Sequence, residues 1–116
     1  MPMMRFGTML DPGSLVVLPF PFSDLRATKR RPVLLLTAPD GYGDFLAMPV
    51  TSQPGHPESL ALDQADMQVG MLPKASWIRT DKVVSLNRAL VVKEIGKIGT
   101  GLRLQAVHQL CAKLNA

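Results

Sequence analysis

Short apolar runs separated by turns rich in proline and glycine occupy most of the chain. The pattern predicts strands at residues 14–18 and 33–38. The second of these holds an unbroken apolar run, which is typical of a strand buried on both faces. Further strands are expected at 45–51, 60–62, 77–80, 82–86 and 90–95. The segments 77–80 and 82–86 form either one kinked strand or two.

Two segments have a less regular pattern. In the first, Phe20 and Phe22 alternate with Pro19 and Pro21. Because proline cannot donate a ladder hydrogen bond, we expect this segment to leave the sheet or to follow its edge. The second, residues 64–70, is ambiguous, and one helical turn is an option.

Only the C-terminal segment has a helical pattern, and Thr100 is its candidate N-cap. Apolar residues then recur on one face at spacings of three and four: Leu104, Val107, Leu110, Cys111 and Leu114. Short strands, ten prolines and one terminal amphipathic helix predict a small, strongly curved antiparallel barrel that the helix closes.

Length, charge and cysteine content limit the class of protein. A chain of 116 residues is typical of one domain, which we place at 12–116, after a mobile arm of residues 1–11. The net charge is +4, and four of the thirteen cations lie between Arg26 and Arg31, which favours a polyanionic partner. The single cysteine indicates a reducing compartment, and no apolar segment is long enough to span a membrane, so we expect a cytoplasmic protein.

Several kinds of chemistry lack the residues they need. Cys111, His56 and His108 have no spacing typical of zinc, and we expect no metal or other cofactor. Cys111 lies on the predicted apolar face of the helix, where it should pack rather than react. No glycine-rich phosphate loop is present. A two-histidine ribonuclease would require His56 and His108 to meet, and nothing in the sequence brings them together.

Arg31 and Thr51 are the first candidates for a site. Lys29, Arg30 and Arg31 are expected in the loop before the buried strand, where Pro32 favours an extended conformation at Arg31. Arg31 starts one predicted strand and Thr51 ends the next, so an antiparallel pair would bring them to one edge. A guanidinium and a hydroxyl can stabilise the charge that develops when an RNA 2′-hydroxyl attacks its neighbouring phosphate. The alternative is a solvated basic loop beside a strand-ending threonine, and arginine is a poor base.

A second cluster follows later in the chain. Trp77, Arg79 and Asp81 alternate along a predicted strand and therefore share one face, with Lys82 next to them. An aromatic ring beside a cation can stack a nucleobase, and Asp81 could supply the base that Arg31 cannot. The alternative is Trp77 packed at the edge of the core beside an Arg79–Asp81 surface pair of small energetic value.

Four motifs together resemble those of the MazF/PemK-like (Kid-like) toxin family. Residues 13–25 open with Gly-Ser-Leu-Val-Val and continue through Pro-Phe-Pro-Phe. Residues 29–35 read Lys-Arg-Arg-Pro-Val-Leu-Leu, residues 48–52 read Met-Pro-Val-Thr-Ser, and residues 76–82 read Ser-Trp-Ile-Arg-Thr-Asp-Lys. The likeness covers residues 13–115, and the combination of the Arg-Pro strand with the later Pro-Val-Thr is its most specific part.

The resemblance implies a homodimeric SH3-like barrel of the MazF/CcdB-like toxin fold. It implies a metal-independent, sequence-selective endoribonuclease, an mRNA interferase, acting as the toxin of a type II toxin–antitoxin system. A cognate antitoxin would occupy the RNA groove, and the complex of the two would bind DNA. By motif position, Arg31 and Thr51 correspond to catalytic residues of the family, and Arg79 and Asp81 to the acid–base pair of some relatives.

The remaining cations and the tryptophan complete the expected site. Lys29, Arg30 and Lys82 would hold the backbone of single-stranded RNA electrostatically, and Trp77 would stack a base. Two alternatives stay open. One is a non-catalytic toxin of the same fold that inhibits a protein such as gyrase, as relatives do through the C-terminal helix. The other is a plain RNA-binding SH3-like module.

Overall fold

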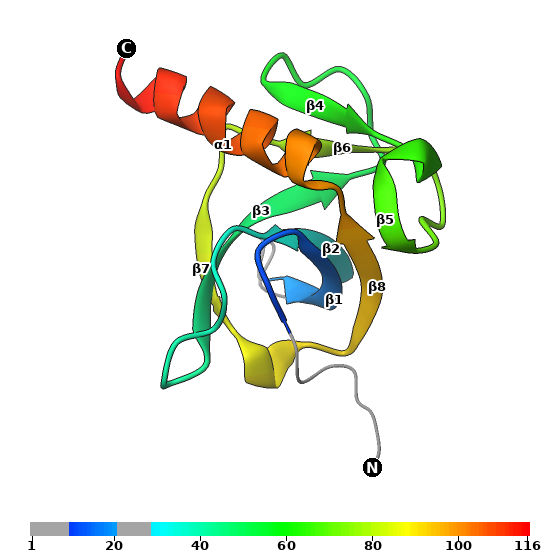
Figure 1. The fold of residues 1–116 in the computed structure, drawn as a ribbon, viewed down its shortest axis with the longest axis vertical. Helices are drawn as coiled ribbons and strands as arrows, with labels where there is room; N and C mark the ends of the chain where they lie inside the picture. Colours follow the sequence, from blue (N-terminus) through cyan, green and yellow to red (C-terminus); the bar gives the residue numbers. More distant parts are fainter. Residues whose placement is uncertain (1–9, 21–28) are drawn as a thin grey trace.

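A computed structural model describes residues 10–20 and 29–116 of the chain, as a curled antiparallel sheet with one helix packed against it (Figure 1). The strands of this described part are β1 Ser14–Phe20, β2 Lys29–Leu35, β3 Asp44–Thr51, β4 Ser59–Leu62, β5 Met67–Gly70, β6 Ser76–Arg79, β7 Val84–Asn87 and β8 Lys93–Ile98. The helical elements are the 3-10 turns η1 Gln64–Asp66 and η2 Arg88–Leu90 and the helix α1 Thr100–Leu114. The predicted fold class, mainly β with a C-terminal helix, is confirmed.

Strand β2 lies at the centre of the sheet. The strand order is β4-β6-β3-β2-β1-β8-β5, with β7 pairing β3 beside this path, and every pairing is antiparallel. Val33, Leu34 and Leu35 of β2 are fully buried. The prediction of a strand buried on both faces is therefore confirmed.

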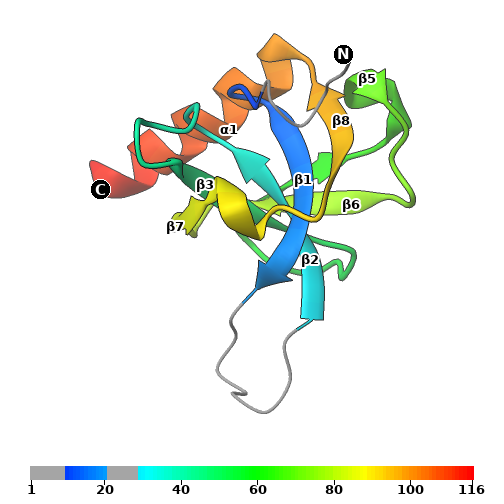
Figure 2. The same cartoon turned by 90° about the horizontal axis from the view of Figure 1, so that it is seen from below.

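The prediction that the basic cluster lies in a loop is wrong. Lys29, Arg30 and Arg31 belong to β2 and pair with Phe20, Pro19 and Leu18 of β1. The two strands run on together beyond the rest of the barrel (Figure 2). Pro19 has no N–H to donate to a neighbouring strand. It is tolerated there because β8 pairs β1 only as far as Val17, so no β8 residue beyond that point needs a donor from β1. Phe22 and Arg26 lie outside the described residues.

Strand alternation divides the buried side chains into two layers. The inner core consists of Leu10, Val16, Leu18, Val33, Leu35, Phe45, Ala47 and Leu86. The outer core, which lies between the sheet and α1, consists of Leu15, Leu34, Met48, Val50, Leu62, Ile78, Ile98 and Ala106. Neighbouring residues of β2 thus enter opposite layers, which fixes the direction of every side chain along that strand.

The barrel begins earlier than expected. Leu10 is only 4% exposed and belongs to the inner core. The backbone N–H of Asp11 donates to Ser14 Oγ at 3.0 Å, and its carboxylate lies 3.3 Å from Lys97 Nζ. These two residues are therefore part of the folded unit, and residues 1–9 of the expected arm lie outside the described residues.

The helix was predicted correctly, but its buried face was not. Helix α1 starts at Thr100 with Gly99 as N-cap and without a capping side chain, so Thr100 is the first helical residue. Ala106 is the residue fully buried against the sheet, with Leu102 and Leu110 packed beside it. A small side chain at that point lets the helix approach closely.

As a result, part of the predicted apolar face is turned to solvent. Leu104 is 52% exposed and Leu114 is 73% exposed. Cys111 is also exposed, which contradicts the expectation that it packs in the core. Val107 and Leu110 are half-buried.

The other element boundaries differ from the predicted ones, in several cases because a side chain bonds the backbone at the end of an element. Segment 64–70 holds η1, capped by Asp63, and then the unexpected strand β5. The kinked segment is two strands, β6 and β7. Asn87 caps η2 by accepting from Ala89 N at 2.9 Å, so β8 starts at Lys93 instead of residue 90. Thr37 Oγ1 accepts from Leu46 N at 2.9 Å, which ends β2 before residue 38.

Leu34→Ala should lower the free energy of unfolding by about 3 kcal/mol, because it opens a cavity in the outer core. The matched change Leu46→Ala, at a side chain 43% exposed, should cost less than about 0.5 kcal/mol. Urea denaturation of both variants measures the difference. Equal losses would show that β2 does not have the central position described.

Candidate active site

Three of the predicted site residues form one row across neighbouring strands. Thr51 of β3 pairs with Trp77 of β6. On the other side of β3, Val33 pairs with Pro49, and Arg31 and Thr51 each lie two residues beyond that pair, on the same face of their strands. Cross-strand partners share a face of the sheet, so the side chains of Arg31, Thr51 and Trp77 lie on one face. All three are half-buried.

This row lies on the face of the sheet that α1 does not cover. Met48, Val50 and Ile78 enter the outer core beneath the helix, and they alternate with the row residues along the same strands. Alternation therefore directs Thr51 and Trp77 away from α1, and it places Arg79 on the same face two residues beyond Trp77. The two clusters that the sequence suggested separately belong to one surface, which we call the active face: Arg31, Thr51, Trp77 and Arg79.

Arg79 is held by a bidentate ion pair with Asp81. Its Nε lies 2.9 Å from Asp81 Oδ1 and one terminal nitrogen lies 2.7 Å from Asp81 Oδ2. The two side chains are 18% and 22% exposed, so the pair is half-buried at the surface. The hydrogen bonds from Arg79 lower the pKa of Asp81, and the carboxylate in turn raises the pKa of Arg79. Asp81 is accordingly a weak base at neutral pH.

The hydroxyl of Thr51 has one local contact. Its Oγ1 accepts from the backbone N–H of Gln53 at 3.0 Å, which fixes the side-chain rotamer. Because that bond uses a lone pair, the hydroxyl proton can be donated to another acceptor. A half-buried hydroxyl donor on the same face as a guanidinium is a suitable combination for holding a phosphate oxygen.

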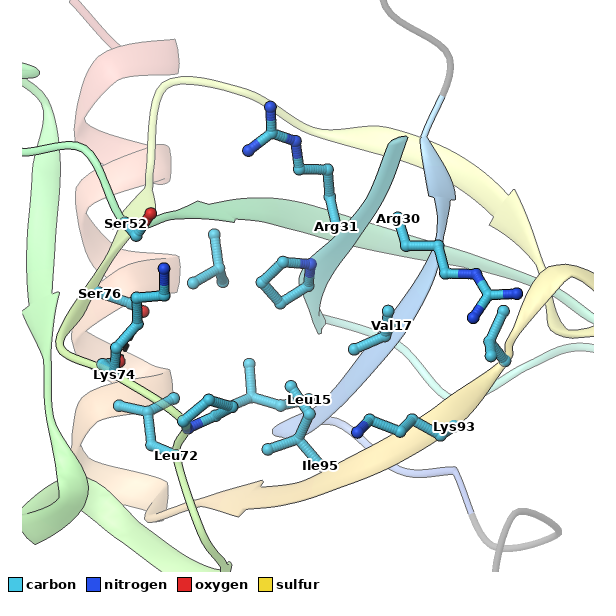
Figure 3. Close-up of a pocket in the computed structure, with 14 residues that line it drawn as sticks. Leu15, Val17, Arg30, Arg31, Ser52, Leu72, Lys74, Ser76, Lys93 and Ile95 are labelled. Atoms are coloured by element: carbon cyan, nitrogen blue, oxygen red, sulfur yellow. Dashed lines mark hydrogen bonds between the residues drawn. The ribbon is translucent and has the colours of Figure 1, made fainter. Parts of the chain in front are cut away.

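The other cations divide between the two faces. Lys29 alternates with Arg31 and lies on the active face at the exposed start of β2. Lys82 is exposed in the turn that follows β6. Arg30 lies on the opposite face, and its guanidinium points away from that of Arg31 (Figure 3). The prediction grouped Arg30 with Lys29 and Arg31 at one site. Three adjacent cations in a strand cannot share one face, so Arg30 lies apart from the other two.

Arg30 and Arg31 both line a cavity of about 470 Å³ on the outer side of the β1–β2–β8 sheet. The floor of this cavity is apolar and comes from Leu15, Val17, Val50, Leu72 and Ile95. Its rim carries four cations, Arg30, Arg31, Lys74 and Lys93, with Ser52 and Ser76 near Lys74 (Figure 3). Sequence reasoning missed Lys74 and Lys93, since isolated lysines give no signal until the fold brings them together.

No metal centre is evident in residues 10–20 and 29–116, where no group of three or more His, Cys, Asp and Glu side chains could hold an ion. His56 lies in the loop before β4, and its carbonyl accepts from Ser59 Oγ at 2.8 Å, whereas His108 is exposed on α1. Nothing in this geometry joins the two histidines. Within the same described part, no helix is long and apolar enough to cross a membrane.

Comparison with solved structures gives close matches over nearly the whole chain. MazF (Form-I) from Deinococcus radiodurans is 25% identical, covers 92% of this chain and 97% of its own, and gives a TM-score of 0.73. The MazE–MazF complex (Form-III) of that organism is 23% identical, covers 91% of this chain and 96% of its own, and gives a TM-score of 0.74. An endoribonuclease in complex with its cognate antitoxin from Mycobacterial species is 14% identical. It covers 92% of this chain and 96% of its own, with a TM-score of 0.70. A search of curated proteins finds no match.

The small barrel with one C-terminal helix is thus the fold of the MazF toxins. The model of the PemK-like, MazF-like toxins of type II toxin–antitoxin systems matches residues 11–116. The chain belongs to that family. The resemblance noted in the sequence is confirmed.

Asp81→Asn should lower the free energy of unfolding at pH 7 by about 1 kcal/mol, because it removes the charge and one of the two acceptor oxygens of a half-buried bidentate pair. The pKa of Asp81 is lower in the folded than in the unfolded chain. The contribution is therefore present above about pH 4, the unfolded value, and is lost as the pH falls through the folded pKa. Urea denaturation at pH 7 and near pH 3 measures it. A difference between variant and wild type that is equally large at both pH values contradicts the prediction.

Proposed function

We propose that this toxin is a metal-independent, sequence-selective endoribonuclease that cleaves single-stranded RNA. The observation that supports this most strongly is the active face, where two guanidinium groups, a hydroxyl and an indole lie on one surface of three neighbouring strands. Guanidinium and hydroxyl groups are donors suited to phosphate oxygens, and an indole offers a surface for stacking an unpaired base.

In the proposed reaction, the 2′-oxygen bonds to the adjacent phosphorus while the bond to the 5′-oxygen breaks. The products are a 2′,3′-cyclic phosphate and a 5′-hydroxyl. The proton of the 2′-hydroxyl passes to water, and the departing 5′-oxygen takes a proton from the Arg31 guanidinium or from water. Arg31 stabilises the charge on the pentavalent phosphate, and Thr51 donates to a non-bridging oxygen.

The Arg79–Asp81 pair has a supporting role in this proposal. The lowered pKa of Asp81 argues against its acting as the general base. We assign it to holding the guanidinium of Arg79 in a fixed orientation, in which Arg79 adds positive charge near the phosphate. Lys29 and Lys82 attract the RNA backbone, Trp77 stacks a base, and Arg30 contributes to long-range attraction from the opposite face.

The partner proposed for this chain is a cognate antitoxin that covers the RNA site. Solved structures with this fold include MazE–MazF and an endoribonuclease bound to its cognate antitoxin. The apolar cavity whose rim carries Arg30, Arg31, Lys74 and Lys93 adds a second positive surface, which Arg31 shares with the active face. We propose that the functional unit is a cytoplasmic homodimer, as the family resemblance implies.

The exposed side of α1 favours a second candidate function. Leu104, Cys111 and Leu114 are exposed and could contact another protein. A non-catalytic toxin of the same fold, acting on a protein such as gyrase through this helix, would use that surface and would not need Arg31. A plain RNA-binding module, the third possibility, would bind RNA with a steep salt dependence and leave it intact.

Incubation of the purified protein with a long RNA in EDTA tests the proposal. We expect cleavage at a few sites, reduced about 10²- to 10³-fold by Arg31→Ala and by Thr51→Ala, because each removes a donor to the developing charge. Arg88→Ala is the matched control, since Arg88 is exposed in η2 and should leave cleavage unchanged.

The other outcomes separate the alternatives. Intact RNA that is nevertheless bound, with affinity falling steeply with salt, would favour the binding module. Toxicity in cells that survives Arg31→Ala would favour the protein-directed toxin. Cleavage that disappears in EDTA and returns with a divalent cation would contradict the metal-independent mechanism.

A further inference from the structure

Thr80 lies between the members of the Arg79–Asp81 pair but on the other face of the sheet. Its side chain is directed toward α1, and the residue is only 2% exposed. Thr80 Oγ1 lies 2.9 Å from Gln109 Oε1 on α1 and 3.2 Å from the carbonyl oxygen of Glu58. The single hydroxyl proton can be donated to either oxygen, so Thr80 contacts both the helix and the loop before β4.

A second contact fastens the same part of the helix to that loop. Lys113 Nζ lies 2.8 Å and 3.0 Å from the two carboxylate oxygens of Glu58. Gln109 and Lys113 are four residues apart and so lie on the same side of α1. With Pro57, Ser59 and Ala112 they surround a cleft of about 410 Å³, so in this region polar contacts take the place of close apolar packing.

Thr80 lies within the turn that carries the ion pair. Within the turn, the backbone N–H of Lys82 reaches the carbonyl of Arg79 only at 3.4 Å, which is a weak hydrogen bond. The bidentate geometry of Arg79 and Asp81 requires the backbone at both residues to stay fixed. Thr80, placed between them and anchored to α1, supplies that restraint.

We propose that Gln109 and Lys113 of α1 are positioning residues for Arg79, acting through Thr80 and Glu58 on the turn at the end of β6. This inference rests on the proposed function in one respect, namely that Arg79 contributes to RNA cleavage. The helix then has a role on the active face although it packs against the opposite face. Its C-terminal half fixes the orientation of a guanidinium that it does not touch.

The test uses neutral substitutions, so that no charge near Asp81 is changed. The charged groups that face Asp81 are Arg79, Lys82 and Lys113, with Glu58 paired to Lys113. Thr80→Val removes the hydroxyl at nearly constant shape, and Thr80→Ser restores it. Gln109→Ala removes the partner on the helix. Its matched control is Gln105→Ala, one turn earlier on α1 and exposed.

Two readouts are measured on the full chain: the pH titration of the Asp81 side-chain carboxyl by carbon-13 NMR, and the kcat and KM of RNA cleavage. Thr80→Val and Gln109→Ala should each raise the pKa of Asp81 toward its ordinary value, because the guanidinium is no longer held against it. They should also lower kcat about tenfold with little change in KM, as expected for a misplaced transition-state group. Thr80→Ser and Gln105→Ala should match the wild type in both readouts.

An Asp81 titration identical to wild type in both Thr80→Val and Gln109→Ala would overturn the inference. So would a shifted titration with unchanged kcat, because the pair would then be positioned without serving the reaction. Gln109→Ala alone decides the matter if Thr80→Val does not fold. Should the wild type leave RNA intact, the proposed function fails, and the NMR titration still shows whether α1 positions the pair.

Discussion

The burial of β2 between two layers of apolar side chains is the constraint on which the rest of the structure depends. Val33 and Leu35 enter the inner core and Leu34 enters the outer core, and all three are fully buried. Because the side chains of a strand alternate, these three positions determine the face on which each cation of the same strand lies. Arg31 therefore lies on the same side of β2 as Val33 and Leu35, which is the active face. Arg30 lies on the other side, with Leu34.

The sheet carries this constraint to residues far apart in sequence. Pairing of β2 with β3 and of β3 with β6 puts Arg31, Thr51 and Trp77 on one face of neighbouring strands, although 46 positions separate the first from the last. The floor under the row is rigid because its strands also form the outer core beneath α1. Donors on such a support need little reorganisation when a charged transition state forms, which is the condition for strong electrostatic stabilisation.

Much of the fold could be predicted from periodicity and turn residues. The strands at Ser14, Val33 and Phe45 and the final helix were recognised because each has a strong local signal. The missed features depend on tertiary contacts. The strand character of Lys29–Arg31 comes from pairing with β1, and the buried face of α1 is set by close packing at Ala106, which a count of large apolar residues overlooks. Likewise, Lys74, in the loop between β5 and β6, shares a cavity with Lys93 of β8 only in the folded sheet, where β5 pairs with β8.

The central claim is that one face of the sheet binds RNA, and the single tryptophan of the chain reports on that face directly. The decisive measurement is a fluorescence titration of Trp77 with a short RNA made uncleavable by 2′-deoxy substitution, together with anisotropy of the labelled RNA. The account predicts saturable quenching that follows the anisotropy and weakens in Arg31→Ala. Binding detected by anisotropy while the fluorescence of Trp77 stays constant would place the RNA elsewhere and contradict the account.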